Sequence, residues 1–323
     1  MVPAIFAMFC LLLGASTTQA GPADDYPNRP VRIVVPFPAG GPTDTYARLV
    51  ADKLQKKFGQ AFYIENKPGA TGGVGTSFVA SAPADGYTLL FASNSSHVIG
   101  QLLQAKKAFS AKDFRPLSML LRYPLYLVVN SSLPVKSVAE FVAFAKQNPG
   151  KLNFGSPGIG SGGHLVTELF VAAAGIKTVH IPFKGVASAQ ISLVSGEVHF
   201  MFDSVGSSQG LVDDGKLRGL AISGREHLAR IPNIPTLKEV GYPQFDDMII
   251  WLGILGPSAM PDPIAEKLEV ALAEIIRLPD VTNRIQEASA VPVGSEGGEL
   301  AGFMIHEAPL WEAIIRENNI PMQ

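Results

Sequence analysis

The sequence predicts an α/β protein with mostly parallel strands, folded as two lobes with a ligand cleft between them. Short runs rich in Val, Ile, Leu, Phe and Tyr alternate with helical patterns along the chain, the order typical of parallel sheets. The chain has 323 residues, enough to bury two cores rather than one. Two apolar runs, residues 125–129 and 249–255, are the expected crossings between the lobes.

Residues 1–20 have the features of a signal peptide. Residues 4–15 are almost all apolar, and the small residues near the end of this segment predict cleavage after Ala20. An apolar run of about a dozen residues is too short to span a bilayer comfortably, although neither Lys nor Arg precedes it. The alternative is a buried N-terminal helix. We therefore expect an exported, periplasmic protein.

Composition argues against several classes of protein. The only cysteine, Cys10, lies in the predicted signal peptide, so a mature chain would have no disulfide and would depend on its core for stability. The 26 basic and 28 acidic residues nearly balance and form no block of one sign. This pattern argues against a nucleic-acid-binding face. No run of about 18 apolar residues, the length expected of a membrane span, occurs later in the sequence.

The first lobe is expected to open with a strand, loop and helix. Residues 31–35 predict the strand and residues 36–44 the loop, and the helix that follows has an apolar face and ends at Gly59. Further strands are predicted at residues 62–65 and 87–92, with a glycine-rich segment and a helix of small residues between them.

The second lobe is expected to repeat this pattern. Ser137 and Glu140 have capping-box spacing and open a helix. The loop 156–163 follows a short strand and leads into a helix that ends at Gly175. The remaining strands are predicted at residues 179–182, 198–202 and 217–222, before a mainly helical tail. The chain thus divides into a signal peptide (1–20), lobe 1 (21–124 plus 251–323) and lobe 2 (125–250).

The loop 36–44 is the first candidate binding site. Its glycines allow the backbone to approach a ligand closely, and a helix start presents free amides that suit a carboxylate. The alternative is an ordinary turn in which Thr43 or Asp44 caps the helix. Spacing alone does not separate the two.

The loop from Ser156 to His164 is the second candidate. Gly158, Gly160 and Gly163 satisfy the G-x-G-x-x-G pattern of dinucleotide-binding proteins. However, residues 180–184 offer no acidic side chain for a ribose. A second helix start that faces the first across a cleft fits better, with the hydroxyls of Ser156 and Ser161 as further donors.

Asp203 follows an apolar strand and precedes a stretch rich in Ser and Gly. Ligands collect at strand ends in α/β proteins. Because an ionised Asp repels a carboxylate, the expected role is to accept a hydrogen bond from a hydroxyl, an amine or water. The alternative is a cap for the helix that begins near Ser204.

Catalytic and metal-binding arrangements are not expected. No P-loop or H-E-x-x-H motif occurs, and the histidines are scattered without metal-ligand spacing. His164 is expected to support the loop, and Lys184 to be a solvated lysine or a weak attractor of anions. We therefore expect no cofactor, no metal and no enzyme activity. A periplasmic hydrolase or dehydrogenase is the least favoured hypothesis.

Ordered motifs along nearly the whole expected mature chain resemble one family. The opening Tyr26-Pro-x-Arg-Pro-Val-Arg-Ile-Val-Val-Pro-Phe-Pro-Ala-Gly-Gly41, with Thr43-Asp44, is similar to that of the substrate-binding proteins of tripartite tricarboxylate transporters, the Bug family. Further matches follow in the same order: Glu65-Asn-Lys-Pro-Gly-Ala70, Asp85-Gly-Tyr-Thr-Leu-Leu90, Lys112-Asp-Phe-x-Pro116, Pro149-Gly-Lys-Leu-Asn-Phe-Gly-Ser156, Ser161-Gly-Gly-His-Leu165, Pro182-Phe-Lys-Gly185, Met201-Phe-Asp203 and Gly215-Lys-Leu-Arg218.

The resemblance implies a periplasmic binding protein of the Venus-flytrap type, close to type II, that holds a small organic acid. Its partners would be the small and large membrane subunits of a transporter, and the protein would be a monomer. One wall of the implied site consists of Phe37, Ala39, Gly40, Thr43 and Asp44. The other consists of Ser156, Gly158, Ser161, Gly162 and Asp203. Ser93 and Asn94 fall in a variable loop that would select the distal group of the ligand.

Residues 204–210 depart from the family pattern, which often has Asn and Pro there, and this leaves the identity of the ligand open. The function that the resemblance implies is capture of a carboxylate-bearing solute and its delivery to a tripartite transporter. The alternative is a sensor protein that presents its ligand to a two-component system.

Overall fold

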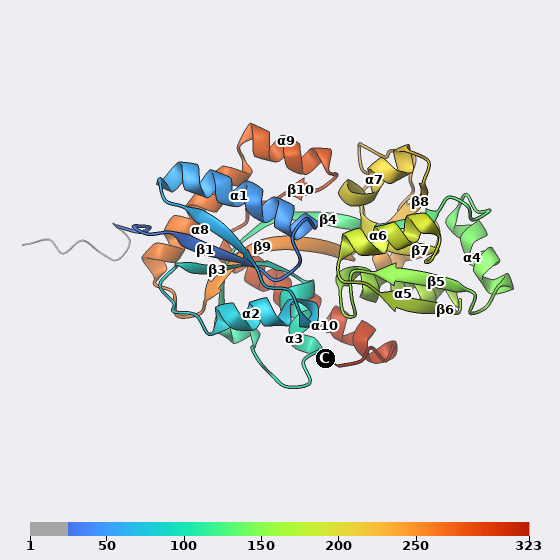
Figure 1. Ribbon diagram of the computed structural model, residues 1–323, viewed down its shortest axis with the longest axis horizontal. Helices are drawn as coiled ribbons and strands as arrows, with labels where there is room; N and C mark the ends of the chain where they lie inside the picture. Colours follow the sequence, from blue (N-terminus) through green and yellow to red (C-terminus); the bar gives the residue numbers. More distant parts are fainter. Residues whose placement is uncertain (1–24, 323) are drawn as a thin grey trace, which may run out of the picture.

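The computed structural model describes residues 25–322, so the predicted signal peptide, residues 1–20, lies outside the described residues. The described part of the chain forms two α/β lobes side by side (Figure 1). Within that part, no helix is both long and apolar enough to cross a membrane.

The first lobe is built on a mixed sheet in the order β2-β1-β3-β9-β4, with β10 also paired to β4. β1 runs parallel to β2 and β3, whereas β9 runs antiparallel to β3 and β4. The bounds are β1 (Val31–Val35), β2 (Phe62–Asn66), β3 (Thr88–Ser93), β4 (Phe114–Asn130), β9 (Ile249–Pro257) and β10 (Val291–Pro292).

The second lobe is built on the order β4-β7-β5-β6, with β8 also paired to β4. β5 runs parallel to β6 and β7, while β7 and β8 run antiparallel to β4. The bounds are β5 (Leu152–Ser156), β6 (Thr178–Pro182), β7 (Phe200–Ser204) and β8 (Leu217–Ile222).

The long strand β4 belongs to both sheets. Its residues 114–124 pair with β9, and its residues 125–130 pair with β7 and β8. The expectation of mostly parallel strands is therefore correct for the outer strands and wrong around β4 and β9. These strands carry the chain between the lobes without a crossover helix, so they meet their neighbours antiparallel.

Helices cover both faces of the first sheet (Figure 1). Val31, Ile33 and Val35 of β1 pack in a core with α1, α8 and α9, and Val34 packs in another core that includes α2 and α10. This alternation is the period-two pattern of a strand buried on both faces. The bounds are α1 (Pro42–Phe58), α2 (Gly73–Ala80), α3 (Gly100–Leu102), α8 (Asp262–Ile276), α9 (Pro279–Glu287) and α10 (Gly297–Glu317).

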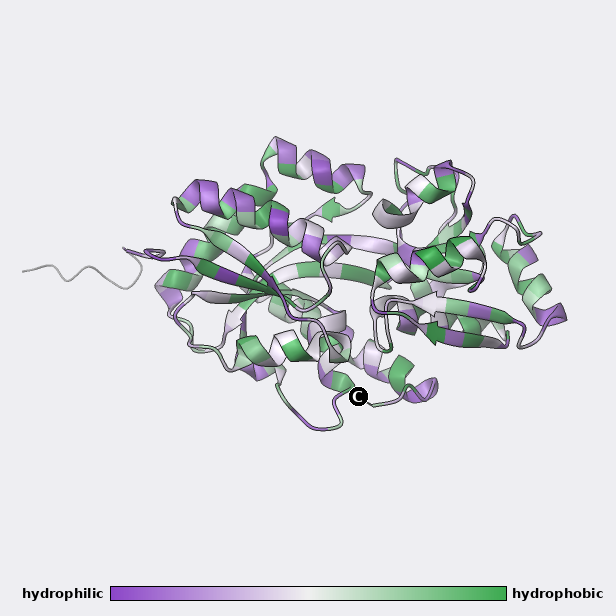
Figure 2. Ribbon diagram, in the orientation of Figure 1, coloured by the Kyte–Doolittle hydropathy of each residue, from purple (hydrophilic) through white to green (hydrophobic). Residues whose placement is uncertain are grey.

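The second sheet is covered in the same way. Phe154, Phe200 and Phe202 pack in a core with α4 and α5, while the opposite face packs on α6 and α7. The strands of both lobes are mainly hydrophobic, and hydrophilic residues gather on the outer helices (Figure 2). The bounds are α4 (Val138–Gln147), α5 (Gly162–Ala174), α6 (Val186–Ser195) and α7 (Val205–Asp213).

The predicted helix boundaries rest on local capping chemistry. Ser137 caps α4, since its side chain accepts the Glu140 amide at 3.2 Å. The reciprocal half of the capping box differs from expectation, because the Glu140 carboxylate accepts from Lys136 rather than from Ser137. Gly59 and Gly175 end α1 and α5 in the left-handed conformation, with φ of 68° and 60°, as glycine does at helix ends.

Candidate functional site

A cleft of about 740 Å3 lies between the two lobes. Its walls are the loops that follow β1, β2, β3, β5, β6 and β7, together with residues of β4 and β9. Loops at the carboxyl ends of strands are where α/β proteins collect ligands. A volume of this size is within the range of small-molecule sites.

Most of the residues expected at the site line this cleft. Those that line it are Phe37, Ala39, Thr43, Ser93, Gly158, Ser161, Gly162 and Asp203. Gly40 lines an adjoining hollow of about 460 Å3. Asp44, Asn94 and Ser156 are buried and line neither space.

Asp44 holds the first wall in shape. Its carboxylate accepts hydrogen bonds from the Gly40 amide at 3.0 Å, from Arg48 at 2.9 and 3.0 Å, and from Asn66 at 2.9 Å. Burial opposes ionisation of Asp44, but the hydrogen bonds from Arg48, Gly40 and Asn66 outweigh burial, and the pKa is lowered. Neither Asp44 nor Thr43 caps α1, because the N-cap is Gly41 without a side-chain bond.

The start of α1 leaves backbone donors at the cleft. The first intrahelical bond runs from the Thr45 amide to the Gly41 carbonyl, at 3.0 Å. The amides of Thr43 and Asp44 therefore have no acceptor within the helix, and Thr43 itself lines the cleft. These donors and the helix dipole favour an anionic group at this position.

The start of α5 uses its donors within the protein. Ser161 caps the helix by accepting the His164 amide at 3.2 Å, and the Gly162 amide donates to Ser95 Oγ at 2.9 Å. Only the Gly163 amide, among the first amides of this helix, has neither an intrahelical nor a side-chain acceptor. The expected second anion-binding helix start is therefore largely occupied.

Among the hydrogen bonds that join the lobes in the described part of the chain, two are made by residues that line the cleft. The Gly162 amide of the second lobe reaches Ser95 of the first, and Thr71 Oγ1 donates to the carbonyl of Ile159. Thr71, Ser95 and Tyr123 all line the cleft, and sequence reasoning did not identify them. Thr71 lies within the glycine-rich segment noted from the sequence, residues 69–75, and Ser95 adjoins Asn94, so a weak local signal existed for both.

Asn94 supports the crossing strand rather than facing the cleft. Its Nδ2 donates to the Ile249 carbonyl at 2.9 Å, and its Oδ1 accepts the Ser95 amide at 3.1 Å. Asn94 also contacts Glu307, whose carboxylate accepts from Trp251 and Trp311 at 2.5 and 2.9 Å. Burial raises the pKa of Glu307 to about 7 against these hydrogen bonds. Asn94 thus holds the loop after β3 against β9 and does not line the cleft.

Asp203 lies near the end of β7 beside the cleft, and its hydrogen-bond partners among the described residues belong to its own lobe. Its carboxylate accepts from Ser208 at 2.5 Å and from Gln190 and the Ser204 amide at 2.7 Å each. Burial raises the pKa of Asp203 to about 6, while these hydrogen bonds act to lower it. The cap of α7 is Ser204, not Asp203.

Ser208 also lies at the centre of a G-x-S-x-G pattern, residues 206–210, which the sequence prediction overlooked. It sits within α7 and donates to Asp203. A nucleophile elbow instead places its serine on a sharp strand-to-helix turn. The pattern therefore does not mark a catalytic serine.

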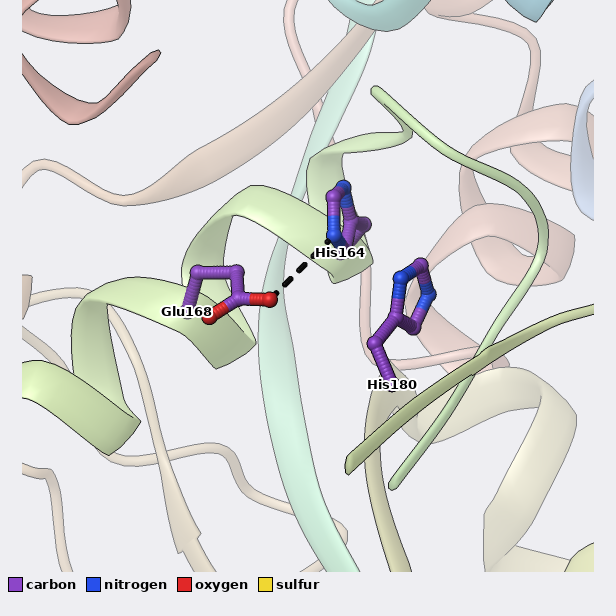
Figure 3. A group of neighbouring side chains, drawn as sticks. All are labelled: His164, Glu168 and His180. Carbon is purple, nitrogen blue, oxygen red and sulfur yellow. Dashed lines mark ion pairs between the residues drawn. The ribbon is translucent and has the colours of Figure 1, made fainter. Parts of the chain in front are cut away.

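His164, Glu168 and His180 gather beside the second wall, with donor atoms within 4.8 Å of one another (Figure 3). Sequence spacing did not predict this cluster. The rings of His164 and His180 are stacked, with centroids 3.9 Å apart and planes 18° apart. The lone pairs of stacked rings lie in nearly parallel planes and do not converge on one ion.

The hydrogen bonds of the cluster also disfavour a metal. The Gly160 amide donates to His164 Nδ1 at 3.0 Å, which places the proton of the neutral ring on Nε2, 3.5 Å from Glu168. A histidine that binds a metal through Nε2 needs that nitrogen free. His180 Nε2 lies 2.7 Å from Ser156 Oγ. Burial and the neighbouring His164 lower the pKa of His180 to about 3, so His180 is a neutral support for the loop 156–164 through its contact with Ser156.

The comparisons with known proteins agree with this architecture. A family model described as "Tripartite tricarboxylate transporter family receptor" matches residues 46–320. The chain belongs to this family. Because family members and structural neighbours are solute-binding receptors and not enzymes, the chain is a solute-binding receptor, and the expectation of no enzyme activity is confirmed.

Individual relatives cover nearly the whole chain. The protein BugT of Bordetella pertussis is 32% identical over 322 residues, which span 99% of this chain and 98% of BugT. The R. palustris protein Rpa4515, solved with adipate, superposes with a TM-score of 0.87 at 34% identity, over 92% of this chain and 99% of that one. MatC of Rhodopseudomonas palustris, solved with bound malate, gives 0.84 at 31% identity, over 90% of this chain and 100% of MatC.

Proposed function

We propose that this receptor captures a small carboxylate-bearing solute between its lobes and delivers it to the small and large membrane subunits of a tripartite transporter. The observation that carries the proposal is the start of α1, where the amides of Thr43 and Asp44 have no intrahelical acceptor beside the cleft. Two structural relatives were solved with the carboxylates adipate and malate, which supports the same ligand class.

Capture would proceed by closure of the lobes about the crossing strands. We assign lobe 1 to residues 21–124 plus 251–323 and lobe 2 to residues 125–250, on the change of sheet partner along β4. The bonds Ser95–Gly162 and Thr71–Ile159 would stabilise the closed form. A ligand that contacts both lobes favours that form by its differential affinity.

The site that we propose has two groups of residues. Those that contact the ligand are the lining residues expected from the sequence, joined by Thr71, Ser95 and Tyr123. The buried residues Asp44, Ser156 and Asn94 would hold the cleft loops in place without contacting the ligand. The receptor would work as a monomer in the periplasm, exported by the signal peptide of residues 1–20.

A thermal-shift screen of small organic acids, each paired with its neutral amide, tests the proposal. A solute that binds only the folded state raises the melting temperature by mass action. We expect at least one acid to raise it and the matched amide to have no effect. Equal shifts by acid and amide would contradict capture by carboxylate. Delivery is then tested by measuring solute uptake into membrane vesicles that contain the small and large transporter subunits, with and without the receptor.

A further inference from the structure

We infer that the acid held in this cleft carries a single carboxylate on an apolar body, such as an aromatic or aliphatic monoacid, and not two or three carboxylates. This inference rests on the proposed function and narrows its ligand class. Three properties of the cleft lining carry it: uncovered apolar surface on both walls, polar groups that already have partners, and a fixed carboxylate.

Apolar side chains face the cleft from both lobes. Phe37 of the first lobe and Phe183 and Val186 of the second line it and are only partly buried. Ile250 of β9 adds a buried apolar contact. A Cβ atom at Gly185 would lie 3.7 Å from Pro38 of the opposite wall, so these walls approach each other closely. An apolar ligand body would cover surface that is otherwise exposed to water.

Several hydroxyl groups of the lining already have partners within the protein. Ser95 accepts the Gly162 amide, Ser161 bonds the Gly158 carbonyl and the His164 amide, and Ser204 bonds Ser207. Each further hydroxyl or carboxylate on a ligand would have to compete with these bonds or lose its hydration, which costs binding energy.

Arg230 and Arg284 line the adjoining hollow, but within the cleft itself the charges disfavour a second carboxylate. Asp203 lines the cleft, and its side chain is fixed by Ser208, Gln190 and Ser204. It would repel a distal carboxylate at contact distance. Lys184 is the one cationic residue among the described residues that line the cleft, and it is exposed, so it offers only a screened attraction.

Tyr123 leaves room for one distal polar group. It lines both the cleft and the adjoining hollow, and its hydroxyl has no hydrogen-bond partner among the described residues. A hydroxyl or carbonyl on the far end of the apolar body would satisfy it. A monoacid with one such group fits the lining better than a polyhydroxylated acid.

Isothermal titration with matched acids tests the inference. Hexanoate and adipate share a six-carbon chain and differ by one carboxylate, and benzoate and terephthalate are the aromatic equivalent. Protein is first unfolded and refolded to remove any solute from expression. We expect the better monoacid to bind at least tenfold more tightly than its diacid. A ratio below tenfold, or a preference for the diacid, overturns the inference.

Two variants separate the causes. Phe183→Ser should weaken monoacid binding at least fivefold, whereas Val270→Ser, at an exposed position of α8, should change it less than twofold. Equal effects would contradict a role of the apolar wall. If the amides benzamide and hexanamide bind as tightly as the acids, or if no acid binds, the proposed function itself fails. Binding of diacids alone would overturn only the single-carboxylate inference.

Discussion

The two walls of the cleft are built from the same kind of unit but use their polar groups differently. Each follows a buried strand with a glycine-containing loop and the start of a helix. At α1 the amides of Thr43 and Asp44 have no intrahelical acceptor, whereas at α5 Ser161 and Ser95 accept the amides of His164 and Gly162. We infer that the first wall keeps donors for a ligand and that the second uses donors to join the lobes.

The buried aspartates of the two lobes show the same contrast. Asp44 has a guanidinium partner, Arg48, and the hydrogen bonds there outweigh burial and lower its pKa. Asp203 has only neutral donors, and burial raises its pKa to about 6. Nearly complete burial thus accompanies a lowered pKa at Asp44 and a raised pKa at Asp203, because only Asp44 has a cation beside it.

The largest expected effect is the pH dependence that Asp203 contributes. Its pKa in the folded state is raised from 3.8 to about 6, so the folded state binds more protons than the unfolded state between these values. The contribution of Asp203 to stability is full at low pH and is lost as pH rises through 6. The stability advantage of wild type over Asp203→Asn should be about 2.5 kcal/mol greater at pH 4 than at pH 8.

Chemical denaturation at a series of pH values measures this difference. The variant Asp214→Asn, at an exposed position just after α7, is the control and should follow the wild-type curve. A gap between wild type and Asp203→Asn that widens with rising pH would have the wrong sign. It would mean that the hydrogen bonds from Ser208, Ser204 and Gln190 stabilise the anion more than burial opposes it.

Removal of the Asp44 carboxylate should damage the first wall. Asp44→Ala leaves the Gly40 amide, Asn66 and Arg48 without their shared acceptor, at a cost of about 2 kcal/mol. Ligand affinity should fall at least tenfold because the loop 36–44 loses its anchor. Titration and thermal melting measure the two effects. Asp52→Ala, which breaks an exposed ion pair with Lys56 on the same helix, should change each only slightly.

The lowered pKa of Asp44 gives this variant a pH signature opposite to that of Asp203. Asp44 contributes stability above its unfolded pKa and loses it as pH falls through the folded value. The destabilisation by Asp44→Ala should therefore shrink as the solution is acidified below about pH 4. A cost independent of pH would assign the effect to lost packing rather than to the charge.

The sequence was most informative where structure is local. The pattern of strand, loop and helix at residues 31–58 and 152–174 located both walls, because apolar periodicity and glycine act within a few residues. It could not locate Ser95, whose partner Gly162 is 67 residues away, or Thr71, which bonds Ile159 across 88 residues. Contacts between the lobes depend on which strands pair with each other. Local patterns in a single sequence do not reveal that pairing.

The occupied donors of the second wall were hidden for the same reason. The position of Gly162 at a helix start predicts that its amide has no acceptor within the helix. The structure shows that Ser95 of the other lobe accepts a hydrogen bond from this amide. His180 lies beside His164 because β6 pairs with β5, with His180 opposite Phe154. The register between β5 and β6 therefore brings the two histidines together, and the spacing of histidines in the sequence does not predict this contact.

The bond between Ser95 and Gly162 offers a smaller test of the contrast between the walls. Ser95→Ala leaves the Gly162 amide without its acceptor, at a cost of about 1 kcal/mol to the closed form. Affinity should fall about fivefold, and small-angle scattering should show a more open protein at partial saturation. Ser77→Ala, which removes a bond within α2, is the control. A rise in affinity would show that this amide belongs to the ligand and that the two walls are equivalent.

The smallest expected effect concerns Lys184, the exposed cation of the second wall. Lys184→Ala should reduce the association rate of an acid by no more than about threefold at low salt, and the reduction should vanish near 0.5 M salt. Stopped-flow binding at two ionic strengths measures it. A loss of affinity that persists at high salt would mean that Lys184 contacts the ligand carboxylate directly. In that case the second wall, and not the amides of α1, would supply the main counter-charge.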